Sequence, residues 1–194
     1  MQGEIISIPS GEDFDGLDGH VLRFTGAFSE VQFLIETIVG MHLRRQMPHL
    51  GSALVKHTMS RLTDDQRNKL FRALAREVQY SGDLTNFGVI FERAKQLRNK
   101  VGHALSIGPV VAPGRQLVVG VTHTLTSKTD AVPEPLLPST FIRMTADCKW
   151  LTQHVLRVGY VAQPDAFKDA AGNPSEPPDP GSLPVGGESL RRPT

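Results

Sequence analysis

Side chains that can bind a phosphate and move a proton lie close together in the stretch FERAKQLRNKVGHALS, residues 91–106. Arg98 carries a planar guanidinium that can donate two parallel hydrogen bonds to a phosphate. His103 can gain or lose a proton near neutral pH. Asn99 lies one helical turn before His103, where its amide can orient the imidazole. These residue types therefore favour chemistry on a phosphate group.

A helix over residues 85–105 is needed to place these side chains on one surface. At about 100° per residue, the apolar positions fall within roughly a third of the circumference and predict a buried face. They are Phe87, Ile90, Ala94, Leu97, Val101, Ala104 and Leu105. With Arg98 at zero, four further residues follow within about 140° and away from the core. In order of angle these are Gly102, Lys95, Asn99 and His103.

A simpler interpretation of the same residues is structural. Gly102 begins the end of the helix, and Arg98, Lys100 and His103 are cations that the negative C-terminal end of a helix dipole favours. Basic residues are common in a last turn. The spacing alone leaves this interpretation and the chemical one open.

Two acidic residues lie near the polar arc. Glu92, with Gln96, continues the line through Asn99 and His103 at helical spacing, and its carboxylate either tunes His103 or is simply solvated. Glu36 lies in a helix predicted earlier in the chain, one position off its apolar stripe. Its side chain could face a polar groove of the bundle. The sequence does not decide between these alternatives.

Further helices are predicted on both sides of this one. Residues 19–45 carry an apolar stripe at alternating steps of four and three, which indicates a helix with one buried face. The stripe consists of Phe24, Phe28, Val31, Ile35 and Ile38. A shorter helix is expected over residues 52–62.

A third helix is predicted to begin after Thr63 and to end near Tyr80. Thr63 stands three residues before Gln66, which is a capping-box pattern. Asp64 and Asp65 follow in the first turn, where the helix dipole favours anions. The start of this helix is therefore indicated by its capping residues as well as by its apolar positions.

The last third of the ordered sequence changes in character. Residues 106–127 hold Val and Thr runs around a Pro-Gly turn signal, which predicts a small β-hairpin. A last helix is expected over residues 139–162, with apolar residues three and four apart. Cys148 lies on that stripe and is interpreted as a small buried hydrophobe, not a nucleophile.

Length and composition predict one domain with two flanking segments. The chain has 194 residues, of which 39% are apolar and 21% charged, as in ordinary globular proteins. Residues 1–18 are expected to be a flexible lead-in and residues 19–162 the helical domain. Residues 163–194 are rich in Pro, Gly and Ser with few apolar anchors and are predicted to be disordered.

The residues LRNKVGHA, 97–104, resemble the signature of the HEPN superfamily: an Arg, four to six residues, then a His, often with Asn directly after the Arg. Arg98, Asn99 and His103 match these positions. The resemblance implies an all-α fold, a HEPN-like bundle of four to five helices with the motif near the end of a late helix. The small β-hairpin before the last helix departs from the commonest layout of the family.

The resemblance also implies a function, that of a metal-independent endoribonuclease in a toxin, antiphage or RNA-processing role. Such domains usually act as homodimers in which the Arg and His of two subunits meet in one cleft. The expected catalytic residues are then Arg98 as phosphate clamp, Asn99 as a group that holds His103 or contacts the phosphate, and His103 as base or acid. An antitoxin or a defence-system protein is an expected partner.

A second hypothesis is that the chain keeps the fold and the motif but serves as a dimeric binding or assembly module. Lys plus Arg number 21 and Asp plus Glu 20, so no bulk positive charge attracts RNA. RNA binding would depend on a local cluster, for which the candidates are Lys95, Lys100, Arg44 and Arg45. Cations lining one groove would favour the nuclease, whereas Arg98 and His103 buried in a subunit contact would favour the module.

Other kinds of site are not indicated by the sequence. The seven His residues do not have the spacing of a metal site, and no glycine-rich phosphate loop follows a strand. We therefore expect neither a metal nor another cofactor. No signal sequence or long apolar span is recognised, which predicts a cytoplasmic protein without membrane contact.

Overall fold

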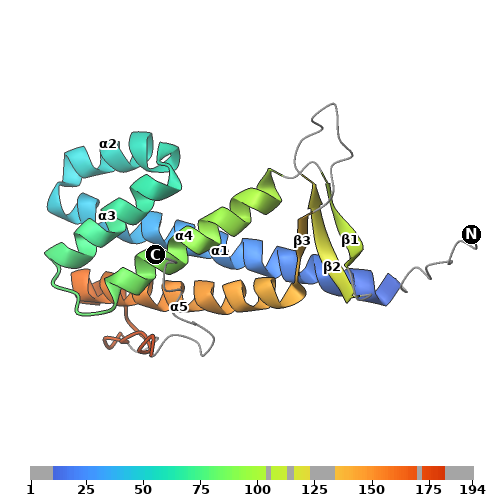
Figure 1. The fold of residues 1–194 in the computed structure, drawn as a ribbon. Coiled ribbons are helices and arrows are strands. Elements are labelled where there is room, and N and C mark those ends of the chain that lie inside the picture. Colours follow the sequence, from blue (N-terminus) through green and yellow to red (C-terminus); the bar gives the residue numbers. More distant parts are fainter. Residues whose placement is uncertain (1–10, 104–105, 113–115, 123–133, 170–171, 182–194) are drawn as a thin grey trace, which may run out of the picture.

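The computed structural model describes residues 11–103, 106–112, 116–122, 134–169 and 172–181. Five α-helices are found in this part of the chain, and a small antiparallel sheet lies between the last two (Figure 1). The helices are α1 (Gly11–Gln46), α2 (Pro48–Thr58), α3 (Asp64–Glu77), α4 (Leu84–Gly102) and α5 (Pro138–Ala162). The prediction of an all-α bundle with a β-hairpin before the last helix is confirmed.

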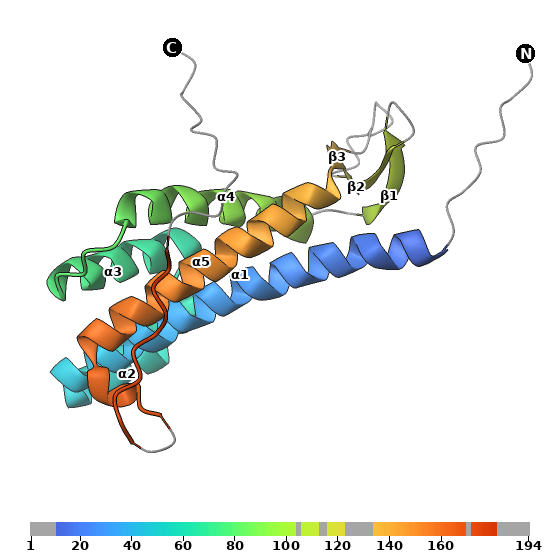
Figure 2. The same cartoon turned by 90° about the horizontal axis from the view of Figure 1, so that it is seen from below.

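Helices α1 and α5 form the centre of the bundle and lie side by side in both views (Figures 1 and 2). The predicted stripe of α1 is buried, with Phe24, Phe28, Val31 and Ile35 wholly inaccessible to solvent. The ring centroids of Phe24 and Phe141, on α5, lie 6.0 Å apart. Burial of these aromatic and aliphatic side chains is the main favourable contribution to folding of the bundle.

The predicted stripe of α5 is also buried. Cys148 is wholly inaccessible, as expected for a small buried hydrophobe, and burial raises the pKa of its thiol to about 12. A thiol with this pKa carries almost no thiolate near neutral pH, so it is a poor nucleophile.

The first two helices differ from the sequence prediction at their boundaries. Helix α1 begins at Gly11 instead of residue 19, and residues 11–20, which are mainly Gly and Asp, carry no apolar stripe from which the sequence could predict these turns. Helix α2 begins at Pro48, earlier than the predicted residue 52. Proline suits the first turn of a helix, since its missing N–H has no partner there in any case. A 3₁₀ turn (Met59–Arg61) follows α2.

Helix α3 begins as predicted. The Thr63 hydroxyl accepts a hydrogen bond from the Gln66 N–H at 3.3 Å, and the Gln66 side chain accepts one from the Thr63 N–H at 2.8 Å. Helix α4 is capped by Asp83, whose carboxylate accepts from the Asn86 N–H at 2.9 Å. These caps fix where α3 and α4 start, and so where their polar residues lie.

The predicted hairpin consists of β1 (Ser106–Ala112) and β2 (Gln116–Thr122), paired antiparallel with Ser106 opposite Thr122. A short strand β3 (Glu134–Leu136) adds to β2, so the sheet has one strand more than the hairpin predicted. The sheet lies at the end of the bundle where α4 ends and α5 begins (Figure 1). Val119 joins it to the hydrophobic core.

Part of the predicted disordered tail packs on α5. A 3₁₀ turn (Pro164–Ala166) follows α5, and the rings of Phe167 and Tyr160 meet edge to face with centroids 6.0 Å apart. Glu176 pairs with Arg157 of α5. These few anchors order residues 163–169 and 172–181, whereas the prediction rested on the low average apolar content of the whole tail. The predicted tail residues 182–194 and the lead-in residues 1–10 lie outside the described residues.

Candidate functional site at the end of helix α4

The three motif residues come from the last turns of α4 but face different surroundings. The predicted apolar face is buried at Phe87, Ile90, Ala94 and Leu97, which fixes the rotation of the helix. Arg98 and Asn99 are partly buried, whereas His103 is exposed. The polar arc predicted from the sequence is therefore present, but its members do not share one environment.

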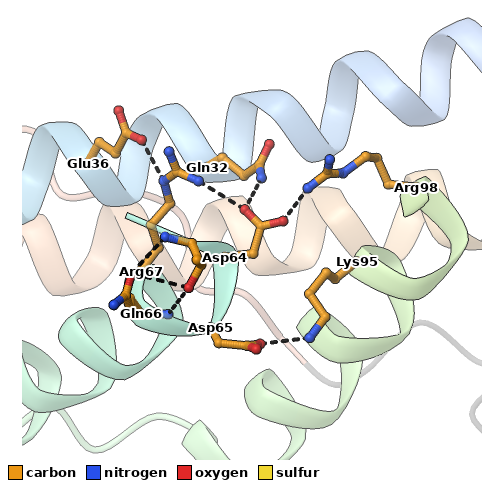
Figure 3. A network of polar contacts seen from close by, with 9 residues as sticks. Gln32, Glu36, Asp64, Asp65, Gln66, Arg67, Lys95 and Arg98 are labelled. Carbon is orange, nitrogen blue, oxygen red and sulfur yellow. Dashed lines mark hydrogen bonds and ion pairs between the residues drawn. The ribbon is translucent and has the colours of Figure 1, made fainter. Parts of the chain in front are cut away.

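Arg98 points inward, toward α3 and α1 (Figure 3). Its Nη2 donates a hydrogen bond to Asp64 Oδ2 and forms an ion pair with that carboxylate. The guanidinium carbon lies 5.8 Å from the centroid of the Phe28 ring, a cation–π contact. The side chain is 33% exposed, so part of the guanidinium still faces solvent.

Asp64 is the centre of a polar network that joins three helices (Figure 3). Its Oδ1 accepts from Arg67 Nη1 at 3.0 Å and from Gln32 Nε2 of α1. Arg67 Nε in turn donates to Glu36 Oε1 at 2.5 Å. Two guanidinium groups thus face two carboxylates, so the network is electrically balanced. Asp64 is only 9% exposed, and its charge-assisted hydrogen bonds offset the cost of its burial.

Lys95, a predicted RNA-binding residue, has its charge met by two carboxylates. Its ammonium lies 2.7 Å from Asp65 Oδ1 and 2.7 Å from Glu92 Oε2. The hydrogen bond that Lys95 donates to Asp65 raises the pKa of Lys95 above its usual value, with a second contribution from Glu92. The same contact lowers the pKa of Asp65. Lys95 is 16% exposed, so it offers little free charge to a polyanion.

His103 caps the C-terminal end of α4, where its backbone N–H donates to the Asn99 carbonyl at 3.0 Å. Within the residues that the structure describes, neither the His103 imidazole nor the Asn99 amide makes a side-chain hydrogen bond. The predicted orienting contact between these two side chains is therefore not among the described contacts. The exposed imidazole remains accessible to a ligand.

The other predicted RNA-binding residues do not gather around the motif. Lys100 is exposed on the last turn of α4. Arg44 and Arg45 are exposed in the last turn of α1, beside α2, at the end of the bundle away from the sheet (Figures 1 and 2). One subunit therefore does not bring the Arg44 and Arg45 cations to the end of α4.

The sequence pattern does not reveal the residues that hold Arg98. It indicates Asp64 only as a residue favoured by the helix dipole, and it singles out neither Gln32 nor Arg67. A signal was present in α1, where Gln32 and Glu36 lie four residues apart beside the apolar stripe. Two polar residues at that spacing share one helix face and indicate hydrogen-bonding or charged partners on a neighbouring helix.

Comparisons with known proteins leave the motif as the main functional signal, since the chain matches no family model, no curated protein and no solved structure. Among the described residues, no group of three or more His, Cys, Asp or Glu side chains is placed to hold a metal ion. No helix in that part of the chain is long and apolar enough to cross a membrane.

Proposed function

We propose that the protein is a metal-independent endoribonuclease of HEPN type that acts as a homodimer. The observation that carries the proposal is the end of α4, where Arg98, Asn99 and an exposed His103 follow one another in the Arg-Asn-x3-His pattern. An accessible imidazole, five residues after a guanidinium that a carboxylate holds in place, is suited to phosphate-ester chemistry.

In the proposed reaction the RNA supplies its own nucleophile. His103 takes the proton from a ribose 2′-hydroxyl, and that oxygen attacks the adjacent phosphorus while the bond to the 5′-oxygen breaks. The partner subunit's His103 gives a proton to the leaving 5′-oxygen. The products are a 2′,3′-cyclic phosphate and a free 5′-hydroxyl, so atoms and charge balance without a metal.

Arg98 acts in this proposal as a clamp for the phosphate. Asp64 binds Nη2 and fixes the plane of the guanidinium, and no described residue accepts a hydrogen bond from Nε. A guanidinium held in place by a buried carboxylate loses little conformational freedom when it binds a second anion. Asn99 and Lys100 then serve the flanking phosphates.

One observation favours the second candidate function, a dimeric binding or assembly module without activity. Arg98 is already part of a balanced network with Asp64, Arg67 and Glu36, which a purely structural role explains without any RNA. In such a module Arg98 would brace α4 against α1 and α3, and His103 would be an interface residue.

Cleavage of mixed cellular RNA in EDTA separates the two candidates. The wild-type protein is compared with His103→Ala and with His57→Ala, which removes another exposed histidine from the last turn of a helix. The nuclease is supported if wild type and His57→Ala give cyclic phosphate ends and His103→Ala, folded by circular dichroism, gives none. Equal cutting by all three proteins, or none by the wild type, would contradict it.

A further inference from the structure

A groove runs between α3 and α4. Its volume is about 470 Å³, and it is lined mainly by polar side chains, among them Asn68, Arg72, Thr85, Glu92, Arg93 and Gln96. Phe71 and Phe87 pack beneath it with ring centroids 4.6 Å apart and hold the two helices together. The volume lies within the range of small-molecule sites in proteins.

Two polar atoms in this groove are buried without a partner. Arg72 Nε and Asn68 Oδ1 are both inaccessible and make no hydrogen bond. In the described part of the chain Arg72 also forms no ion pair. Most buried polar groups in folded proteins are paired, so an unpaired donor and an unpaired acceptor in one groove point to a ligand that fills both.

Arg72 is also held where a ligand can reach its guanidinium. A methyl group built on Gly88 of α4 would lie 3.2 Å from Arg72 Nη1, so the guanidinium rests against helix backbone that carries no side chain. Arg72 thus bridges from α3 to α4 across the groove and keeps its charge there.

The charges that line the groove are two arginines and one carboxylate. The carboxylate of Glu92 is occupied, because it pairs with Lys95 at 2.7 Å and accepts from Gln96 Nε2 at 3.0 Å. Burial raises the pKa of Asp147, and the charges of Arg143 and then Arg93 lower it, but in the described part of the chain no ion pair joins Arg93 to that carboxylate. The groove therefore has net positive character, to which Arg72 contributes.

We propose that the α3–α4 groove is a nucleotide subsite that binds one residue of the RNA chain next to the cleavage point. A phosphate oxygen supplies the anionic acceptor that Arg72 lacks, and a ribose hydroxyl or a base amine supplies the donor that Asn68 lacks. A bare anion would satisfy the arginine alone. That the ligand is RNA rests on the proposed function, whereas the unpaired groups of the groove are independent of it.

The position of the groove fits a strand that continues to His103. Glu92, Gln96, Asn99 and His103 recur at steps of four, three and four along α4, so they share one face of the helix. From Gln96 to His103 the helix rises by about 10 Å. A single RNA strand lying along this face would pass from the groove to the exposed imidazole, while Arg98 faces Asp64 on the other side.

Binding is measured by fluorescence anisotropy with a 5′-fluorescein-labelled single-stranded RNA oligonucleotide in EDTA. The parent protein is the full-length His103→Ala variant, which prevents cleavage of the RNA during the titration. The test variant carries the substitution Arg72→Gln in the same parent protein. The matched control is Arg76→Gln, since Arg76 lies one turn further along α3 and is exposed. Loss of a charge-assisted hydrogen bond predicts that Arg72→Gln weakens binding about tenfold, whereas Arg76→Gln changes it by less than about twofold.

A second variant, Asn68→Asp, keeps the shape of the side chain but places a carboxylate in the groove, and it should weaken RNA binding to a similar extent. Removal of an unpaired arginine should not destabilise the protein, so urea unfolding of Arg72→Gln should match the wild type if the role of Arg72 is binding. Unchanged RNA affinity in both variants, or no RNA binding by the parent protein, would overturn the proposal that the groove binds RNA.

The outcomes separate the groove from the nuclease. If RNA binding depends on Arg72 but the wild-type protein never cuts RNA, the groove is an RNA-binding site and the proposed nuclease function is contradicted. If cleavage depends on His103 but RNA affinity is independent of Arg72 and Asn68, the nuclease function is supported and the proposal that the groove binds RNA is overturned.

Discussion

Replacing Asp64 by Asn tests the network that holds Arg98. The substitution keeps the shape of the side chain but removes a negative charge that Arg98 and Arg67 share. Arg67 keeps Glu36 as a partner, while Arg98 is left beside a neutral amide. The balanced network would then carry one uncompensated positive charge.

The expected loss follows from the burial of the partners. Removing one member of a buried ion pair costs about 3–5 kcal/mol, because the other charge stays buried and unpaired. Arg98 is 33% exposed and can be partly rehydrated. We therefore expect Asp64→Asn to lower the free energy of unfolding by about 2–4 kcal/mol, measured by urea unfolding and circular dichroism.

Asp65→Asn is the matched control. Asp65 is the next residue in the first turn of α3, so its removal weakens the favourable interaction with the helix dipole to a similar extent. Its side chain is 61% exposed, and water screens its pair with Lys95. The loss for Asp65→Asn should be much smaller than that for Asp64→Asn, and the difference reports burial and pairing.

A double-mutant cycle with Arg98→Met completes the test. If Asp64 and Arg98 interact directly, the double variant should lose less stability than the sum of the single variants, with a coupling of about 1–3 kcal/mol. Additive losses within about 0.5 kcal/mol, or an Asp64→Asn variant no less stable than Asp65→Asn, would refute the reasoning.

Three further predictions concern the rest of the bundle. Burial raises the pKa of the Cys148 thiol to about 12, so a thiol reagent at pH 8 should react with it only after unfolding. Gly51→Ala should destabilise the protein, because its methyl group would overlap the Leu43 carbonyl, whereas Gly26→Ala, with open space around it, should stabilise it by about 0.5–1 kcal/mol in urea unfolding. Burial lowers the pKa of His154 from 6.5 to about 4, so the unfolded chain binds the proton more tightly. Stability should fall as the pH falls through this window, and less so in His154→Gln, as thermal melts at several pH values would show.

The fold was largely predictable because its signals are local. The stripe from Phe24 to Ile38 and the capping box at Thr63 each consist of residues close together in the sequence, and each fixes one element. The start of α1 at Gly11 was not predictable from the stripe, since the stripe begins only at Phe24 and the added turns consist mainly of Gly and Asp.

The surroundings of the site were not predictable because they depend on contacts between helices. Asp64 and Arg98 are distant in the sequence and meet only when α3 packs beside α4. The helical wheel did place Arg98 and His103 about 140° apart. That angle allows Arg98 to pack inward while His103 stays exposed, so the helical wheel already permits the two side chains to have different environments. The carboxylate on another helix that draws Arg98 inward could not be predicted from the wheel.

In a protein that cleaves RNA, the contact between Arg98 and Asp64 allows two roles for Arg98. If Arg98 only braces the helices, its charge matters because Asp64 is charged, and Asp64→Asn with Arg98→Met should restore a stable protein with all its activities. Replacing a buried ion pair by uncharged groups is often neutral for stability. If Arg98 also clamps a phosphate, the same double variant regains stability but does not cleave RNA, because methionine cannot stabilise the charge that develops at phosphorus. Stability and cleavage measured on this one variant therefore distinguish a structural arginine from a catalytic one, which neither single substitution can do.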